Sequence, residues 1–174
     1  MKFLALLVMA FALNTEATIY NSKAIVHPEV GKNGMVVSQH YLATNAGHSI
    51  LAEGGNAYDA SIAVAFALAV VLPRAGNIGG GGFMVMFDEA SQESYSIDYR
   101  ETAPEAASKN MFLASDGSVD KKRATQGVLS IGVPGTVYGM WEVHRKFGSL
   151  PWSELLAPAI KLAEDGFLIS PFMA

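Results

Sequence analysis

Residues 77–100 read NIGGGGFMVMFDEASQESYSIDYR, and this stretch organises the interpretation of the chain around it. It opens on four consecutive glycines, Gly79 to Gly82, followed by the short apolar run FMVMF at residues 83–87. Because glycine has no Cβ, another backbone or a ligand can approach such a loop closely. The apolar run is too short for a typical helix and favours a strand that is buried on both faces. We therefore expect a shaped glycine loop that leads into a buried strand.

In the second half of the stretch, residues 95–99 alternate between apolar and polar side chains. Such alternation is typical of a strand that is buried on one face. The alternation separates two faces, Tyr95, Ile97 and Tyr99 on one and Ser96, Asp98 and Arg100 on the other. Arg100 therefore projects from the polar side of a strand end, where its guanidinium group can hold a carboxylate by two parallel hydrogen bonds. The residues alone leave a second interpretation open, in which Arg100 forms a structural ion pair with Asp98 or Glu101.

Length and composition narrow the classes of function. A chain of 174 residues favours one domain. The net charge of −4, the isoelectric point near 5.5 and the lack of a basic stripe argue against a nucleic-acid-binding protein. There is no cysteine, and the four histidines lie far apart without metal-ligand spacing. We therefore expect neither a metal nor a cofactor.

The N-terminus has the pattern of an export signal. Lys2 supplies a positive charge, Phe3 to Leu13 form an unbroken apolar run, and Ala17 ends the polar segment that follows. The run is too short to span a bilayer comfortably. We expect residues 1–17 to be a signal peptide, residues 18–33 a flexible lead-in, and the protein to be exported to a periplasmic or extracellular location. The alternative is an ordinary N-terminal helix.

Periodicity and capping residues predict the elements before the glycine loop. Residues 34–39 are a candidate first strand, and residues 41–53 have helical spacing of their apolar positions. Gly54 and Gly55 are expected to end that helix in the left-handed conformation. Asn56 is expected to cap a second helix over residues 57–72, which is apolar nearly all round and therefore predicted to be buried.

The remaining elements follow from the same signals. We expect a short helix from Pro104 to Leu113, a solvated loop over residues 116–123 and a strand over residues 128–133. Two amphipathic helices are expected over residues 136–147 and 151–165, and Pro158 is expected to kink or split the second because it removes one backbone donor. This mixture favours helices layered on a sheet. The strands are few for so many apolar helix faces, so we expect residues 34–174 to be part of a larger unit.

The motifs for the commonest chemistries are absent. The glycines are not followed by Gly-Lys-Ser/Thr and lead into a strand, which argues against a phosphate-binding loop. There is no GxSxG sequence for a nucleophilic serine. Thr125 and Thr136 have no evident base beside them in the sequence, and Thr136 is better interpreted as a helix cap. Arg100 is thus the candidate functional residue, and no catalytic residue is identified in the chain.

Five stretches resemble the γ-glutamyltransferase family, in the order in which that family carries them. They are GHSILAEGGNAYDASIAVAFAL (47–68), GNIGGGGFM (76–84), IDYRETAP (97–104), GVPGTVYGM (132–140) and GSLPWSELLAPAIKLAEDGF (148–167). The resemblance implies the N-terminal part of the large subunit of an N-terminal-nucleophile hydrolase, an α+β protein with an αββα sandwich. It also implies that Arg100 binds the α-carboxylate of a γ-glutamyl donor.

The resemblance further implies a precursor that cleaves itself into two subunits. The N-terminal threonine of the C-terminal small subunit would be the nucleophile, with its own amine as base, and is expected beyond Ala174. The expected donor is glutathione or a related amide, and the acceptor water, an amino acid or a peptide. Two alternatives stay open: a related amidohydrolase or poly-γ-glutamate processing enzyme, and a non-catalytic truncated paralogue that binds γ-glutamyl compounds.

Overall fold

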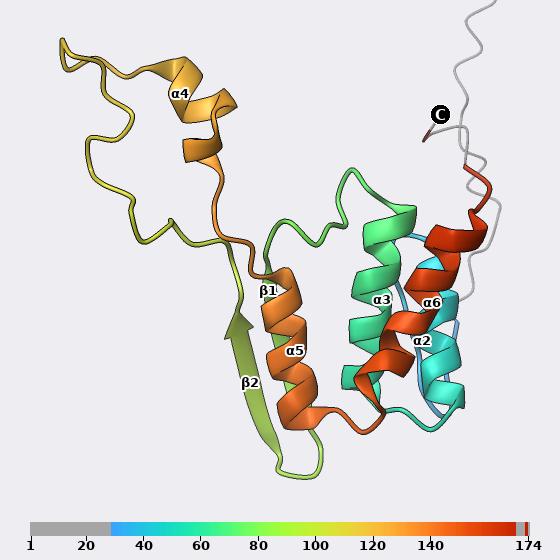
Figure 1. Ribbon diagram of the computed structural model, residues 1–174. Helices are drawn as coiled ribbons and strands as arrows, with labels where there is room; N and C mark the ends of the chain where they lie inside the picture. Colours follow the sequence, from blue (N-terminus) through green and yellow to red (C-terminus); the bar gives the residue numbers. More distant parts are fainter. Residues whose placement is uncertain (1–28, 170–172, 174) are drawn as a thin grey trace, which may run out of the picture. The chain divides into compact units, whose positions relative to one another are not determined.

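The computed structural model describes residues 29–169 and residue 173. The predicted signal peptide and most of the predicted lead-in lie outside these residues. The chain divides into two units, Met1–Lys32 and Asn33–Ala174, and the elements described below belong to the second. In chain order they are α2 (Tyr41–Ala52), α3 (Ala57–Val71), β1 (Phe83–Asp88), β2 (Glu93–Asp98), α4 (Lys121–Gln126), η1 (Val128–Ser130), α5 (Thr136–Phe147) and α6 (Trp152–Asp165), and Figure 1 labels each of them except η1.

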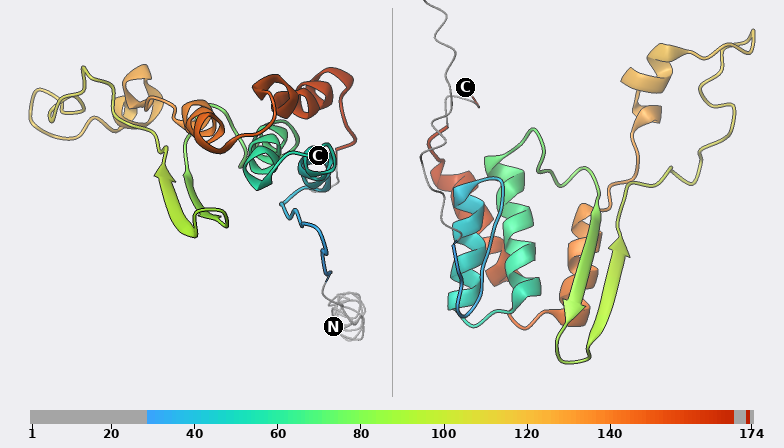
Figure 2. Two further views of the ribbon diagram at one scale, coloured as in Figure 1. Left: turned by 90° about the horizontal axis from the view of Figure 1, so that it is seen from below. Right: turned by 180° about the vertical axis from the view of Figure 1, so that it is seen from behind.

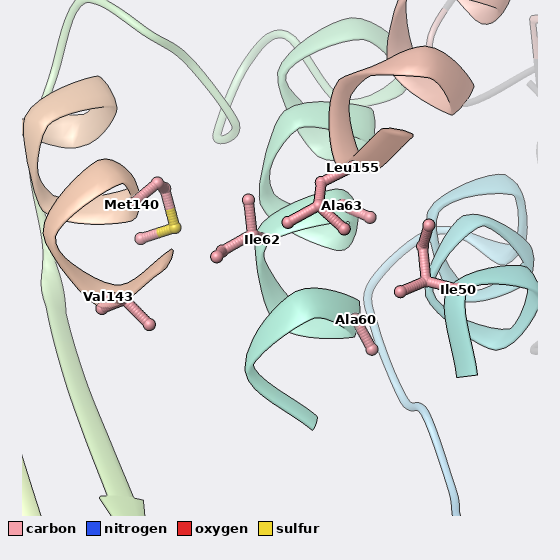
Figure 3. Packing of buried hydrophobic residues seen from close by; sticks show 7 residues of the cluster. All are labelled: Ile50, Ala60, Ile62, Ala63, Met140, Val143 and Leu155. Carbon is pink, nitrogen blue, oxygen red and sulfur yellow. The ribbon is translucent and has the colours of Figure 1, made fainter. Parts of the chain in front are cut away.

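Helix α3 is the centre of the helical part of the fold, as its apolar sequence predicts. It packs against α2, α5 and α6, and Figure 3 shows its side chains facing those of all three neighbours. Ile62 and Ala63 of α3 are fully buried, with Ile50 of α2 and Leu155 of α6 beside them. None of the helices in the described part of the chain is long and apolar enough to cross a membrane.

The connection between α2 and α3 confirms one of two glycine predictions and the helix cap. Gly54 has φ +92°, the left-handed conformation that glycine adopts without strain. Gly55 does not have a positive φ, so the prediction for it is wrong; it is small because a Cβ there would lie 2.7 Å from Ile50 Cγ2. Asn56 caps α3 as predicted: its side-chain oxygen accepts from Asp59 N at 2.9 Å, and Asp59 accepts from Asn56 N at 3.0 Å.

Strands β1 and β2 form an antiparallel hairpin in which Phe83 pairs with Asp98 and Asp88 with Glu93. The hairpin lies beside α5 in the views of Figure 2. On its inner face, Met84, Met86 and Ile97 pack against the helical core. The other face of β1 is open, with Val85 83% exposed. The prediction that FMVMF is buried on both faces is therefore wrong, because a two-stranded sheet is covered on one side only in the described residues.

Three expected elements are not formed. Residues 34–38 are extended but have no strand partner among the described residues, and Val37 is 80% exposed. Pro104 to Leu113 form successive turns instead of a helix. Residues 128–133 form the short 3-10 helix η1 and, at Val133, an isolated bridge to Thr102. In the described part of the chain, none of these three segments forms an α-helix or a paired strand.

Part of the predicted solvated loop at 116–123 is helical, because Asp120 caps α4 by accepting a hydrogen bond from Arg123 N at 3.0 Å. The amphipathic helices α5 and α6 are confirmed, and Gly166 ends α6 with φ +75°. Pro158 lies inside α6, which is one continuous helix from Trp152 to Asp165, so the expectation that Pro158 could split it is wrong. The buried side of α5 is Met140 and Val143. The described residues thus confirm a mixture of helix and strand, while the two-stranded sheet by itself does not form the expected αββα sandwich.

Candidate functional site

Three segments that are far apart in the sequence meet at the end of the hairpin. Gly80, in the glycine loop, accepts hydrogen bonds through its carbonyl from Gly135 N at 2.8 Å and Thr136 N at 3.1 Å, at the start of α5. Tyr99, at the end of β2, donates through its backbone N–H to Gly82 O at 3.0 Å. The glycine loop therefore links the end of β2 to the first turn of α5.

A second contact joins the end of β2 to the segment before α5. Thr102 and Val133 form a bridge in which Val133 N donates to Thr102 O at 2.8 Å and Thr102 N to Val133 O at 3.3 Å. A Cβ at Gly132 would lie 3.0 Å from Glu101 Cβ. The stretches IDYRETAP (97–104) and GVPGTVYGM (132–140) therefore lie side by side, although they are far apart in the sequence.

The glycine loop packs against the backbone at Arg100, as its composition predicts. A Cβ at Gly81 would lie 2.5 Å from Tyr99 O and 2.7 Å from Arg100 Cα. No larger residue fits there without moving the chain. The loop leads into β1, so its amide groups do not form the helix N-terminus that a phosphate-binding loop requires.

Arg100 lies just beyond β2, and its side chain is 69% exposed. Its backbone N–H donates to Asp98 Oδ1 at 2.9 Å, so Asp98 contacts the main chain of Arg100. The guanidinium contact is to Glu101, with 3.9 Å between Arg100 Nε and Glu101 Oε2. An exposed pair at that distance contributes little to stability. Within the described residues the guanidinium group therefore keeps its hydrogen-bonding capacity for a ligand.

Tyr99 precedes Arg100 and points to the opposite side of the strand, into the protein. Its ring packs against the helical core. Burial raises the pKa of the Tyr99 phenol above its usual value, because the charged phenolate is poorly solvated there. The alternation of residues 95–99 predicts that Tyr99 lies on the apolar face, but it does not predict the packing of the ring against Gly139 of α5.

The threonines do not form a nucleophilic site in the described residues. Thr125 Oγ1 donates to Lys121 O at 2.7 Å within α4. Thr136 is the first residue of α5 and its N-cap is Gly135, so the prediction that Thr136 caps the helix is wrong. No group of three or more His, Asp or Glu side chains in the described part of the chain is placed to hold a metal ion.

Asp59 is a fully buried carboxylate with a structural role. It accepts hydrogen bonds from Asn56 N and from the backbone and hydroxyl of Ser149, which precedes α6. The contact between Asp59 and Ser149 joins residues 90 positions apart, so no local sequence pattern predicts it. Asp59 thus ties the start of α3 to the α5–α6 connection and takes no part in the junction around Arg100.

Comparisons with known proteins agree with this arrangement. The family model described as Gamma-glutamyltranspeptidase matches residues 43–174. A glutathione hydrolase proenzyme of Pseudomonas aeruginosa is 50% identical over 137 residues, covering 79% of this chain and 24% of that protein. The glutathione hydrolase proenzyme of Escherichia coli is 45% identical over 150 residues, covering 86% of this chain and 26% of that protein. The chain thus spans about a quarter of the length of these curated relatives.

Solved structures give the same assignment. The chain resembles the γ-glutamyltranspeptidase of Helicobacter pylori with a TM-score of 0.79 and 50% identity, over 84% of this chain and 42% of that one. A cephalosporin acylase from Bacillus halodurans is more distant, with a TM-score of 0.68 and 30% identity over 90% of this chain and 29% of that one. The family model covers residues 43–174, which include the glycine loop and Arg100. The chain therefore belongs to the γ-glutamyltranspeptidase family.

Proposed function

We propose that this chain is the N-terminal part of the large subunit of an enzyme that transfers a γ-glutamyl group from glutathione or a related amide. The acceptor is water, an amino acid or a peptide. The relatives named glutathione hydrolase proenzyme support the activity and a precursor that is cleaved into two subunits. In this proposal the nucleophilic threonine belongs to the small subunit, and Arg100 anchors the donor.

The proposal rests on one observation about Arg100: its guanidinium group is exposed while its backbone is held in place. Its guanidinium group is exposed and lacks a close carboxylate among the described residues, while its backbone is held by Asp98 and packed against Gly81. A guanidinium group on a fixed backbone can bind a carboxylate by two parallel hydrogen bonds and so orient the donor. This favours ligand binding over the structural ion pair.

We also propose that the hairpin belongs to an αββα sandwich that the complete protein finishes. The open face of β1 and the few strands support this, because an apolar sheet face is stable only when another layer covers it. The chain covers 42% of the Helicobacter pylori structure, which leaves more than half of that chain to supply further layers.

The test of the donor-anchoring role uses the complete protein that carries this chain, with substitutions at Arg100. Arg100→Lys keeps the charge but loses the paired geometry, so it raises the KM for γ-glutamyl donors strongly. Arg100→Ala does more: the proposed guanidinium–carboxylate pair is largely desolvated once the donor is bound, so its loss costs on the order of 2–5 kcal/mol of donor interaction. Self-cleavage survives in Arg100→Lys, because maturation does not use the donor carboxylate.

Arg145→Ala is the matched control. Arg145 is also exposed, but it pairs with Glu142 on α5 at 2.7 Å, and its loss leaves donor kinetics unchanged. A 4-aminobutyryl anilide, which lacks only the α-carboxylate of the γ-glutamyl anilide, is a poor donor for the wild type and loses little more with Arg100→Ala. If Arg100→Ala keeps near-normal kcat/KM with correct processing, Arg100 does not anchor the donor.

We propose, finally, that the protein is exported and that the signal is removed near Ala17. The support is the pattern of Lys2 followed by the apolar run Phe3 to Leu13. Mass spectrometry of the mature protein checks this, with a new N-terminus near residue 18 as the expected result. An intact Met1 on the mature protein contradicts it.

A further inference from the structure

The guanidinium group of Arg100 is not held in place by contacts of its own. The nearest carboxylate in the described residues is that of Glu101, at 3.9 Å. Orientation of the side chain must therefore start from the direction of its Cα–Cβ bond, which the backbone on either side determines. The neighbour of Arg100 whose side chain is packed into the protein is Tyr99.

The ring of Tyr99 occupies a slot between the glycine loop and α5. A Cβ at Gly82 would lie 3.0 Å from both Tyr99 Cε2 and the Tyr99 hydroxyl oxygen. A Cβ at Gly139 would overlap Tyr99 Cβ and Cγ. A side chain at either glycine would therefore collide with the ring. Because both positions lack a Cβ, α5 and the glycine loop can enclose the ring from two sides.

The main chain of Tyr99 is held at both ends as well. Its N–H donates to Gly82 O at 3.0 Å, and its carbonyl oxygen lies against Gly135, where a Cβ would overlap it. That carbonyl belongs to the peptide group that Arg100 shares with Tyr99. The ring of Tyr99 and the peptide group before Arg100 are therefore packed against the same two segments, the glycine loop and the start of α5.

We propose that Tyr99 is the positioning residue for Arg100, and that its ring, enclosed by Gly82 and Gly139, sets the affinity of the site for the α-carboxylate of the donor. This inference rests on the proposed function of Arg100. Apart from the hydroxyl oxygen near Gly82, the atoms of Tyr99 that face the two glycines are carbons, so phenylalanine fulfils the role and a flexible aliphatic side chain does not. A displacement of about 1 Å in a positioning group is enough to reduce kcat/KM by up to about a hundredfold.

The experiment compares Tyr99→Leu with Tyr99→Phe in the complete protein, using the γ-glutamyl and 4-aminobutyryl anilides as donors. Tyr99→Leu is expected to raise the KM for the γ-glutamyl anilide about tenfold or more with kcat nearly unchanged. The preference for the donor with the α-carboxylate falls by the same factor. Tyr99→Phe restores both values to those of the wild type.

Two further variants separate positioning from loss of stability. Tyr95→Leu makes the same change on the same face of β2, where the ring packs on Phe147 with centroids 5.0 Å apart. It is expected to lower the melting temperature and to leave the donor preference unchanged. Gly139→Ala keeps Tyr99 but places a Cβ in the slot of its ring, and it is expected to reduce the preference as Tyr99→Leu does.

The inference is overturned if Tyr99→Leu reduces kcat/KM equally for both donors, or if Tyr95→Leu changes the donor preference to the same extent. It is also overturned if the folded Gly139→Ala protein has wild-type preference. Arg100→Ala in the same assay distinguishes the two proposals. If it leaves the preference unchanged, the anchoring role itself fails; if it abolishes the preference and Tyr99→Leu does not, the positioning role alone fails.

Discussion

Helix α3 and strand β1 are similarly apolar, yet their side chains have opposite environments. Ile62, Ala63 and Ala67 of α3 are 0% exposed, whereas Phe83 and Val85 of β1 are 62% and 83% exposed. Helix α3 contacts α2, α5 and α6, and β1 has one paired strand and one covered face. The difference shows that burial depends on how many elements surround a segment, not on its apolar content alone.

The difference bears on the proposed role of Arg100, because Arg100 belongs to the less covered region. The sheet beside it has two strands, so its position relies on contacts with the glycine loop and α5. A binding residue at the edge of a rigid scaffold can meet a ligand while its backbone stays fixed. The site therefore combines an exposed side chain with a tightly packed backbone.

The largest effect is expected for a core substitution in the helical region. Ile62→Ala removes a fully buried side chain and leaves a cavity, so the free energy of unfolding falls by about 3.5 kcal/mol. Ile97→Ala, the same change on the half-buried inner face of β2, costs about 1.5 kcal/mol because less surface is lost. Urea denaturation of the complete protein measures both. Equal losses would show that the hairpin is packed as well as the helices.

Smaller changes in stability are expected at two turns, and their signs are opposite to each other. Gly54, after α2, has φ +92°, and Gly54→Ala destabilises the protein by about 1 kcal/mol because alanine is strained there. Gln92, in the hairpin turn, has φ +59°, and Gln92→Gly stabilises by about 0.5 kcal/mol by relieving that strain. Thermal unfolding checks both signs. A loss of stability in Gln92→Gly would show that the positive φ of Gln92 does not strain the hairpin turn.

The smallest effect is expected on the open face of β1. Residues 18–174 alone are predicted to be poorly soluble or molten and to bind a hydrophobic dye, because that face is uncovered. The variant with Val85→Thr and Phe87→Thr keeps good strand formers and is expected to bind less dye. A sharp thermal transition without dye binding in the unmodified chain contradicts this prediction.

Local sequence was sufficient wherever neighbouring residues cause the structure. Asn56 and Asp59 cap α3 through contacts three positions apart, and Gly54 takes the left-handed conformation at a helix end. The helical spacing of α5 and α6 also predicted their bounds closely. The alternation in SYSIDYR placed Arg100 on the polar side and Tyr99 on the apolar side. These interactions span one turn or one strand, so the sequence determines them by itself.

The tertiary structure decided everything that depends on distant partners. It left residues 34–38 without a strand partner in the described part of the chain and opened one face of β1, since pairing and burial require neighbours that periodicity cannot supply. It joined Asp59 to Ser149. It also brought Gly139 against Tyr99, next to Arg100. The sequence by itself thus determined the candidate residue and its face of the strand, and only the packing of three separate segments determined what holds that residue in place.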